Sequence, residues 1–170
     1  MNTPRHIILR AMEPEDLETL YNIENDEANW AMSATNVPYS RYTLRQYIAN
    51  AANDIYADGQ VRLMIENEDK QVVGVIDLVN FDPTHQRAEL GIIIATPFRQ
   101  QGYGKAALQH LIQTAKAKIH LNQIYAYVAA DNQSSINCLK SVGFQQTTAL
   151  RQWFYYKNKY VDAYVMQLFL

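Results

Sequence analysis

The chain has 170 residues, of which 48% are apolar and 19% are charged, and this composition fits a single globular domain over residues 1–170 with a buried core. No run approaches the roughly 18 apolar residues of a membrane span, and the first residues lead into a strand-like stretch, so we expect a cytoplasmic protein without a signal peptide or a membrane partner. The net charge of −2 argues against a general nucleic-acid binder.

The first part of the chain predicts one short strand and two helices. The strand covers residues 6–10, and a helix then runs from Pro14 to about residue 27, because apolar residues recur there at helical spacing. A second helix is expected over residues 43–57, and Asp58-Gly59 ends it.

Three β-type runs follow, and turn residues separate them. The strands are expected over residues 61–66, 72–81 and 88–95, which together predict a three-strand meander.

The second half predicts two helices and three strands. A helix that ends near residue 115 precedes a strand over 124–128, and a shorter helix over 134–142 ends at Gly143. Strands over 153–156 and 161–168 form a closing hairpin. Because a helix lies between strands only once or twice, the order favours a mixed sheet over a doubly wound parallel one.

Cysteine and histidine usage excludes two further kinds of site. Cys138 is the only cysteine, so the chain has no internal disulfide and no Cys-rich zinc site. The four histidines are scattered without the spacing of metal ligands. We therefore expect no bound metal.

The strongest local signal is a glycine-containing run between a predicted strand and the helix that follows it. Its sequence is Arg99-Gln100-Gln101-Gly102-Tyr103-Gly104-Lys105. Glycines let the backbone approach a ligand closely, and a helix N-terminus offers unpaired N–H donors and a positive dipole end to a pyrophosphate.

Two other phosphate-binding motifs fail at this run. A dinucleotide fingerprint needs an acidic residue about 20 positions later for the ribose, and the stretch from Lys105 to Ala130 has none. A Walker loop needs Ser or Thr after Gly-Lys and an earlier Gly. Here Ala106 follows Lys105, and Arg99 stands where the Gly should be.

What remains resembles the pattern Q/R-x-x-G-x-G/A of the GNAT N-acetyltransferases, matched by Arg99, Gly102 and Gly104. A second match lies downstream, where that family has N-x-x-A/S and G-F. It consists of Asn132-x-x-Ser135-x-x-x-Leu139-x-x-x-Gly143-Phe144. The resemblance covers nearly the whole chain and is closest to the spermidine N-acetyltransferases and the ribosomal-protein N-terminal acetyltransferase subgroup.

The resemblance implies an α+β fold, the GNAT fold. Its central mixed sheet is twisted and mostly antiparallel, with about six or seven strands and about four flanking helices. It also implies acetyl-CoA as cosubstrate. The implied cofactor-binding residues are Ile92, Ile93 and Ile94 for the pantetheine arm, Arg99, Gln100, Gln101, Gly102, Tyr103, Gly104 and Lys105 for the pyrophosphate, and Asn132 and Ser135. Asn132 is equally suited to capping a helix, and the two roles are compatible.

Glu89 stands where many enzymes of this family place a catalytic base. Releasing the free base of an amine with a pKa of about 10.4 costs about 4.6 kcal/mol at neutral pH, so such an acceptor needs a base. Glu89 would act directly or through a water, with direct transfer from acetyl-CoA to the amine. The alternative is an exposed strand-end carboxylate that pairs with Arg87. A strand N–H within residues 92–94 is expected to meet the oxyanion.

One departure from the family concerns the general acid. Many members place a tyrosine four residues after the N-x-x-A/S serine or alanine, and this chain has Leu139 there. Leucine has no proton to donate, so Ser135 becomes the substitute candidate, followed by Tyr125 and Tyr127. Ser135 is equally suited to be only the third residue of a helix. A thiol with a pKa of about 8.5 also leaves tolerably well without an acid.

The charge distribution bears on the acceptor. Residues 1–89 carry 15 acidic and 7 basic side chains, whereas residues 90–170 carry 2 acidic and 8 basic ones, giving net charges of −8 and +6. This division suits a cationic substrate on the first half and an anionic cofactor on the second, or it reflects solvated faces only. In GNAT proteins the first helices form the acceptor wall, which implies Glu24, Asp26 and Glu27 as substrate-binding residues.

The expected function is therefore acetylation of a cationic small-molecule amine, such as the polyamine spermidine. Two alternatives stay open, a protein N-terminal acetyltransferase of the ribosomal type and a non-catalytic CoA-binding module. A homo-oligomer is compatible with each of these functions. One aromatic cluster either lines the acceptor pocket or packs the sheet, and it consists of Trp153, Phe154, Tyr155, Tyr156, Tyr160 and Tyr164.

Overall fold

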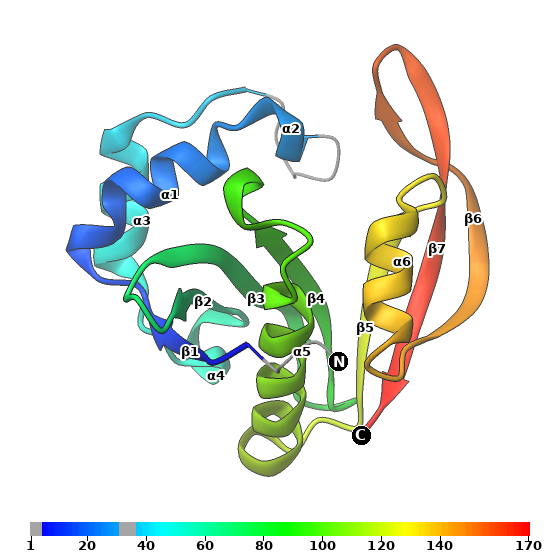
Figure 1. Cartoon of the computed structure of the whole chain (residues 1–170). Helices are drawn as coiled ribbons and strands as arrows, with labels where there is room; N and C mark the ends of the chain where they lie inside the picture. The colour runs from blue at the N-terminus through cyan, green and yellow to red at the C-terminus, as the bar shows by residue number, and fades with distance from the viewer. Residues whose placement is uncertain (1–4, 31–36) are drawn as a thin grey trace.

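The computed structural model describes residues 5–30 and 37–170, and seven strands of these residues form one sheet (Figure 1). The strands are β1 (Ile7–Ala11), β2 (Val61–Asn67), β3 (Val72–Asp82), β4 (Arg87–Ile94), β5 (Gln123–Ala129), β6 (Gln145–Tyr156) and β7 (Lys159–Phe169). Their order across the sheet is β1-β2-β3-β4-β5-β7-β6. Only β4 and β5 are parallel neighbours, so the sheet is mixed and mostly antiparallel, as predicted.

Six α-helices lie within the described residues, two more than the four expected. They are α1 (Leu17–Glu24), α2 (Glu27–Trp30), α3 (Arg41–Asn50), α4 (Ile55–Asp58), α5 (Tyr103–Thr114) and α6 (Gln133–Lys140). Single 3₁₀ turns cover Pro14–Asp16 and Thr96–Phe98, and a π-helical turn over Ala115–Ile119 extends α5. Each of these helices is too short or too polar to cross a membrane.

The two extra helices arise because both helices predicted in the first half are interrupted. The first stops at Glu24, since the Asn25 side chain accepts a hydrogen bond from the Tyr39 N–H at 2.7 Å and donates one to the Tyr39 carbonyl at 3.0 Å. The second stops at Asn50 because Ala51 is extended, and Asp54 then caps the separate helix α4 through the Tyr56 N–H. The prediction of one continuous helix in each place was therefore wrong.

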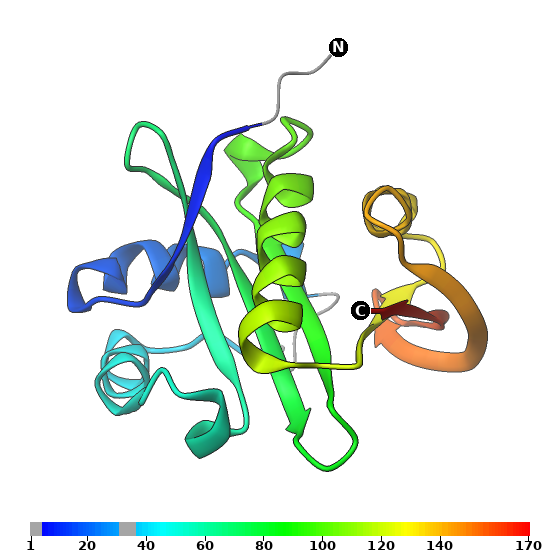
Figure 2. The same ribbon diagram turned by 90° about the horizontal axis from the view of Figure 1, so that it is seen from below.

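The helices cover opposite faces of the sheet. Helices α5 and α6 pack on one face, where Leu108, Ile124 and Leu139 belong to the larger hydrophobic core. Helices α1 and α3 pack on the other face of the first strands, where Leu20 and Leu44 form a smaller core. Figures 1 and 2 show α5 alongside β4, and α6 alongside β5 and β7.

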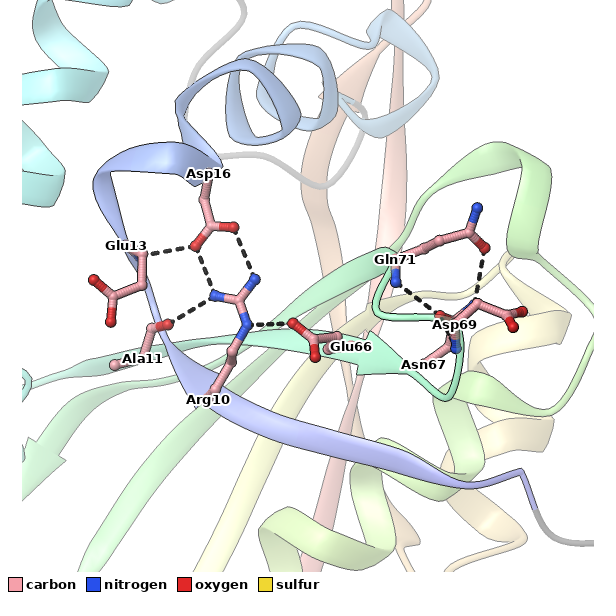
Figure 3. A network of polar contacts seen from close by, with 8 residues as sticks. All are labelled: Arg10, Ala11, Glu13, Asp16, Glu66, Asn67, Asp69 and Gln71. Atoms are coloured by element: carbon pink, nitrogen blue, oxygen red, sulfur yellow. Dashed lines mark hydrogen bonds and ion pairs between the residues drawn. The ribbon is translucent and has the colours of Figure 1, made fainter.

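An ion-pair network fixes the junction between β1, β2 and the turn that leads into α1 (Figure 3). The Arg10 guanidinium donates to both carboxylate oxygens of Asp16, at 2.8 and 2.9 Å, and to Glu66 at 2.6 Å. Asp16 also accepts the Glu13 N–H at 2.8 Å. Burial acts to raise the pKa of Asp16, but these hydrogen bonds outweigh it and hold the pKa below its ordinary value.

The closing hairpin is longer than predicted on its first strand. Strand β6 begins at Gln145 rather than at residue 153. The first half of this edge strand is exposed, so its sequence lacks the apolar alternation that predicts a half-buried strand. The turn at Lys157 and Asn158 has positive φ at both residues, 51° and 57°, as a tight two-residue hairpin turn requires. Figure 1 shows the hairpin rising beyond the rest of the sheet.

Candidate active site

The middle of the sheet divides between β4 and β5. These two strands pair only through Arg87, Ala88 and Glu89, whose partners are Gln123, Ile124 and Tyr125. Beyond Glu89 and Tyr125, β4 stays paired with β3 and β5 with β7, but they no longer pair with each other in the described ladders. The facing edges of β4 and β5 therefore carry backbone groups that are free to bind a ligand.

The three isoleucines predicted to bind pantetheine lie along this open edge. The Ala95 N–H donates to the Val73 carbonyl of β3 at 2.9 Å. Because backbone groups alternate along a strand, the N–H and C=O groups of Ile92 and Ile94 point to the opposite edge, toward β5. The backbone groups of Ile93 point to β3 instead. Ile92 is thus the isoleucine best placed to offer both backbone groups to a ligand in the opening.

The glycine-containing turn leads from the end of β4 into helix α5. Gly102 is the N-cap residue with φ 89° and ψ −4°, and no side chain caps the helix there. This conformation disfavours any residue with a Cβ atom. The first N–H groups of α5 are therefore left as donors at the positive end of a 12-residue helix.

Several side chains of the turn hold its shape. Arg99 donates to the Ile94 carbonyl at 2.9 Å and to the Asn29 side-chain oxygen at 2.6 Å, which ties the turn to β4 and α2. Gln101 donates to the Pro97 carbonyl at 2.9 Å. Gln100 and Lys105 are exposed and are the side chains of the turn that remain open to a phosphate.

The turn, the end of β4 and helix α6 meet at Gly104. A Cβ atom on Gly104 would lie 3.6 Å from Cys138 Sγ on α6 and 3.6 Å from Ile94 Cγ1 on β4. Burial raises the pKa of the Cys138 thiol above its ordinary value, against a smaller opposing effect of Lys105. The thiol is therefore a neutral packing group beside the glycine turn at neutral pH.

Helix α6 begins at Asn132, whose side chain accepts the Ser135 N–H at 3.2 Å. The capping role of Asn132 is thus present in the structure. Ser135 is half-buried, and Leu139 is only 4% exposed within the core between α6 and the sheet. Leu139 therefore serves packing at the position where the family pattern has a tyrosine.

Glu89 lies at the point where the strands divide, beside Tyr125. Asn80 donates to the Glu89 carboxylate at 2.8 Å. Arg87 pairs with Asp82 at 3.2 Å rather than with Glu89, so the partner we considered for Glu89 belongs to another carboxylate. Burial raises the pKa of Tyr125, and the charge of Glu89 adds to the rise, which agrees with their proximity.

Glu89 and Ser135 lie on opposite sides of the sheet. Leu90 and Ile92 of β4 point to the larger core beneath α5 and α6, whereas Ile93 points to the smaller core. Side chains alternate along a strand, so Glu89 shares the face of Ile93. Helix α6, which carries Ser135, covers the other face. The open edges of β4 and β5 lie between the two groups.

The three acidic residues predicted at the acceptor wall differ in their surroundings. Glu24 is buried and forms a close ion pair with Arg62. Asp26 accepts the Thr96 hydroxyl at 3.0 Å and the Ala28 N–H at 3.0 Å. Glu27 is exposed. Asp26 and Glu27 are therefore more available to a ligand than Glu24.

The ion pairs beneath α1 were not predicted from the sequence. Arg62 of β2 donates to Asp77 of β3 at 2.7 and 2.8 Å as well as to Glu24. Burial lowers the pKa of Arg62, but the carboxylates of Asp77 and Glu24 outweigh it, so the pKa is raised and the guanidinium stays charged. The available signal was Asp77 itself, a carboxylate within the apolar run of residues 72–79.

Within the described ranges, no three His, Cys, Asp or Glu side chains gather closely enough to hold a metal ion. The groups at the site are instead backbone donors, one carboxylate and several hydroxyls. They suit binding of an anionic thioester and proton transfer.

The chain is similar in sequence to known acetyltransferases. The profile of the family described as "Acetyltransferase (GNAT) domain" matches residues 6–145. The spermidine N(1)-acetyltransferase of Vibrio cholerae serotype O1 is 24% identical over 95% of this chain and 93% of its own. The putative ribosomal N-acetyltransferase YdaF of Bacillus subtilis is 30% identical over 92% of this chain and 87% of its own.

Solved structures share the fold. The crystal structure of spermidine N-acetyltransferase from Vibrio cholerae in complex with CoA and spermine aligns with a TM-score of 0.87 at 23% identity, covering 96% of this chain and 95% of that chain. A dodecameric structure of spermidine N-acetyltransferase from Vibrio cholerae aligns with a TM-score of 0.81 at 25% identity, covering 96% and 93%.

Proposed function

Because the chain belongs to the GNAT acetyltransferase family, whose acetyl donor is acetyl-CoA, we propose that it acetylates a primary amine of a polyamine such as spermidine. The observation that carries the proposal is the division between β4 and β5 with Glu89 at its closed end. An acyl thioester in this opening meets backbone donors on one strand and a carboxylate at the base of the fork.

Acetyl-CoA fits the groups along the opening. Its pyrophosphate would accept from the first N–H groups of α5, near Gln100 and Lys105. Its pantetheine arm would bond to the backbone of Ile92, much as an added strand would. Asn132 and Ser135 at the start of α6 would border the same arm.

The chemistry follows from the placement of Glu89. The acceptor ammonium loses a proton to Glu89, directly or through a water, and the free amine attacks the thioester carbonyl. An N–H of the 92–94 stretch, best provided by Ile92, stabilises the oxyanion. The carbon–sulfur bond then breaks, and the nitrogen loses its second proton to water, which leaves the neutral amide. The thiolate takes a proton from water, or from the Ser135 hydroxyl, which then regains a proton from water. Glu89 and Ser135 on opposite faces would serve amine attack from one side and thiolate departure on the other.

The acceptor class rests on charge and on relatives. Glu89, Asp26 and Glu27 contribute negative charge on the side of the first helices, which favours a cation. The relatives support two classes of acceptor, because the chain resembles both a spermidine acetyltransferase and a putative ribosomal acetyltransferase. Acetylation of a protein N-terminus is therefore the second candidate, and a non-catalytic CoA-binding module is the third.

A homo-oligomer is part of the proposal. Strand β6 is an edge strand of the sheet, and its first half is exposed. Edge strands of this kind pair readily with another chain. A relative from Vibrio cholerae forms a dodecamer.

Acceptor kinetics at two ionic strengths test the proposal. We expect CoA release to be fastest with spermidine or spermine, with a Michaelis constant that rises with salt because exposed charges are screened. A short peptide with a neutral N-terminal side chain serves as the matched acceptor. Preference for that peptide would favour the second candidate, and acetyl-CoA binding without release in any mixture would favour the third.

A further inference from the structure

Three aromatic rings form a row that leads away from Glu89. Tyr125 and Tyr127 of β5 have ring centroids 5.8 Å apart in an edge-to-face arrangement. The Trp153 indole of β6 lies next, with its centroid 5.4 Å from that of Tyr127 and the two planes inclined by 31°. The row joins β5 to β6 although β7 lies between these strands.

A bulge in β6 is what brings Trp153 over β7. Leu150 pairs with Ala163 and Phe154 with Val161, so three residues of β6 face one residue of β7. Within the bulge Gln152 has φ 52°, and its N–H donates to the Asp162 carboxylate at 2.8 Å. On this face Ala163 of β7 lies level with Ala129, and its side chain is fully buried.

The row lies on the side from which the amine is proposed to enter. Tyr125 is directly paired with Glu89, so the two side chains share a face, and Tyr127 follows on that face two residues later. Alternate residues of β5, namely Ile124, Ala126 and Val128, point into the core beneath α5 and α6. Neither tyrosine is part of a core cluster among the described residues, and both are half-buried.

Packing alone does not account for this placement of Trp153. A tryptophan that stabilises a core hides most of its surface, whereas Trp153 is 52% exposed. Its neighbour Tyr155 is also exposed but contacts Tyr160 at 4.9 Å near the hairpin turn, away from the row. The bulge thus turns one aromatic ring of β6 toward the site and leaves the other outside.

We propose that the row formed by Tyr125, Tyr127 and Trp153 binds the second ammonium group of a polycationic acceptor through cation–π contacts, and so selects diamines and polyamines over monoamines. This inference rests on the proposed function. The reacting amine would lie at Glu89, and Tyr127 lies about 7 Å farther along β5, given a rise of about 3.3 Å per residue. Short methylene chains place successive polyamine charges at comparable separations. Indole and phenol faces attract a cation within about 6 Å of their centroids.

The test compares Trp153→Leu with Tyr155→Leu as a matched control on the same strand. With spermidine and saturating acetyl-CoA, we expect Trp153→Leu to raise the Michaelis constant by about 3- to 30-fold, the range of a cation–π contact. The turnover number, the affinity for CoA and the constants for a monoamine such as butylamine should stay unchanged. The Tyr155→Leu variant should behave as the unmodified protein does.

Other results separate this inference from the function it rests on. Acetylation of spermidine with equal Michaelis constants in Trp153→Leu and the unmodified protein would overturn the inference and leave the proposed function intact. Absence of acetylated product with every amine would overturn the proposed function. In that case Trp30→Phe, which leaves Trp153 as the only tryptophan, is titrated with spermidine and followed by fluorescence. A saturable change that an uncharged amide such as N-butylacetamide does not produce supports the cation site, and a flat titration overturns it.

Discussion

Replacing Gly102 by alanine changes the turn before α5 without adding bulk that the site cannot hold. The new Cβ atom would meet only the Arg5 side chain, at 3.6 Å, so space is not the obstacle. The obstacle is the backbone, because φ at Gly102 is 89°. A residue with a Cβ atom disfavours this conformation by roughly 1–2 kcal/mol.

The backbone strain in Gly102→Ala should lower the affinity for CoA. If alanine relaxes the turn, the N–H groups of α5 no longer converge on the pyrophosphate, and only the strained fraction of molecules binds. An energy of about 1–2 kcal/mol lowers that fraction, and raises the dissociation constant for CoA, by about 5- to 30-fold. Gly104→Ala is the matched control, since its Cβ atom would make ordinary contacts of 3.6 Å to Cys138 and Ile94. A helical Gly→Ala change there should slightly raise thermal stability.

Isothermal titration calorimetry with CoA, together with thermal unfolding, measures both variants. We expect weaker binding in Gly102→Ala and near-normal binding in Gly104→Ala. A larger Gly104→Val side chain should crowd Cys138 and Ile94 and weaken binding as well. Unchanged CoA affinity in both Gly102→Ala and Gly104→Val would show that the pyrophosphate lies elsewhere.

Three further substitutions test the roles of Glu89, Ser135 and Asp16. Glu89→Gln should lower turnover more at about pH 6 than at about pH 9, because a base is needed most when the amine is most protonated; an equal loss in the pH–rate profile would indicate a structural role. Ser135→Ala keeps the N–H that Asn132 accepts, so stability should hold while turnover falls by about 10²-fold if the hydroxyl protonates the thiolate, and normal turnover would leave that proton to water. Asp16→Asn should cost about 2 kcal/mol in urea unfolding at neutral pH through its contacts with Arg10. Since the folded pKa of Asp16 is lowered, this deficit should shrink as pH falls from about 4 through the folded value; a deficit independent of pH would contradict the assignment.

Local patterns predicted the strands and the glycine turn because their causes lie within a few residues. The positive φ of Gly143, which is 103°, and the cap at Asn132 belong to that class. The break after Glu24 does not, since it depends on hydrogen bonds between Asn25 and Tyr39, which lie 14 positions apart.

The ion pairs also could not be predicted from local sequence, because the register of the strands decides which charged residues meet. Arg62 reaches Glu24, 38 positions away, only once β2 lies beneath α1. Arg87 pairs with Asp82 rather than with Glu89 because the start of β4 lies beside the end of β3, where Asp82 stands. The contact of Trp153 with Tyr127 depends on a bulge in β6, and no Gly or Pro in the sequence of that strand predicts the bulge.

The most direct test of the central claim is a competition for a limited amount of acetyl-CoA. Equal concentrations of spermidine, butylamine and a short peptide with a free N-terminus are mixed with the protein, and mass spectrometry identifies the acetylated product. We expect N-acetylspermidine as the main product, and its initial rate of formation should fall in Glu89→Gln. Acetylated peptide as the main product, or an unchanged initial rate in that variant, would contradict the proposed function.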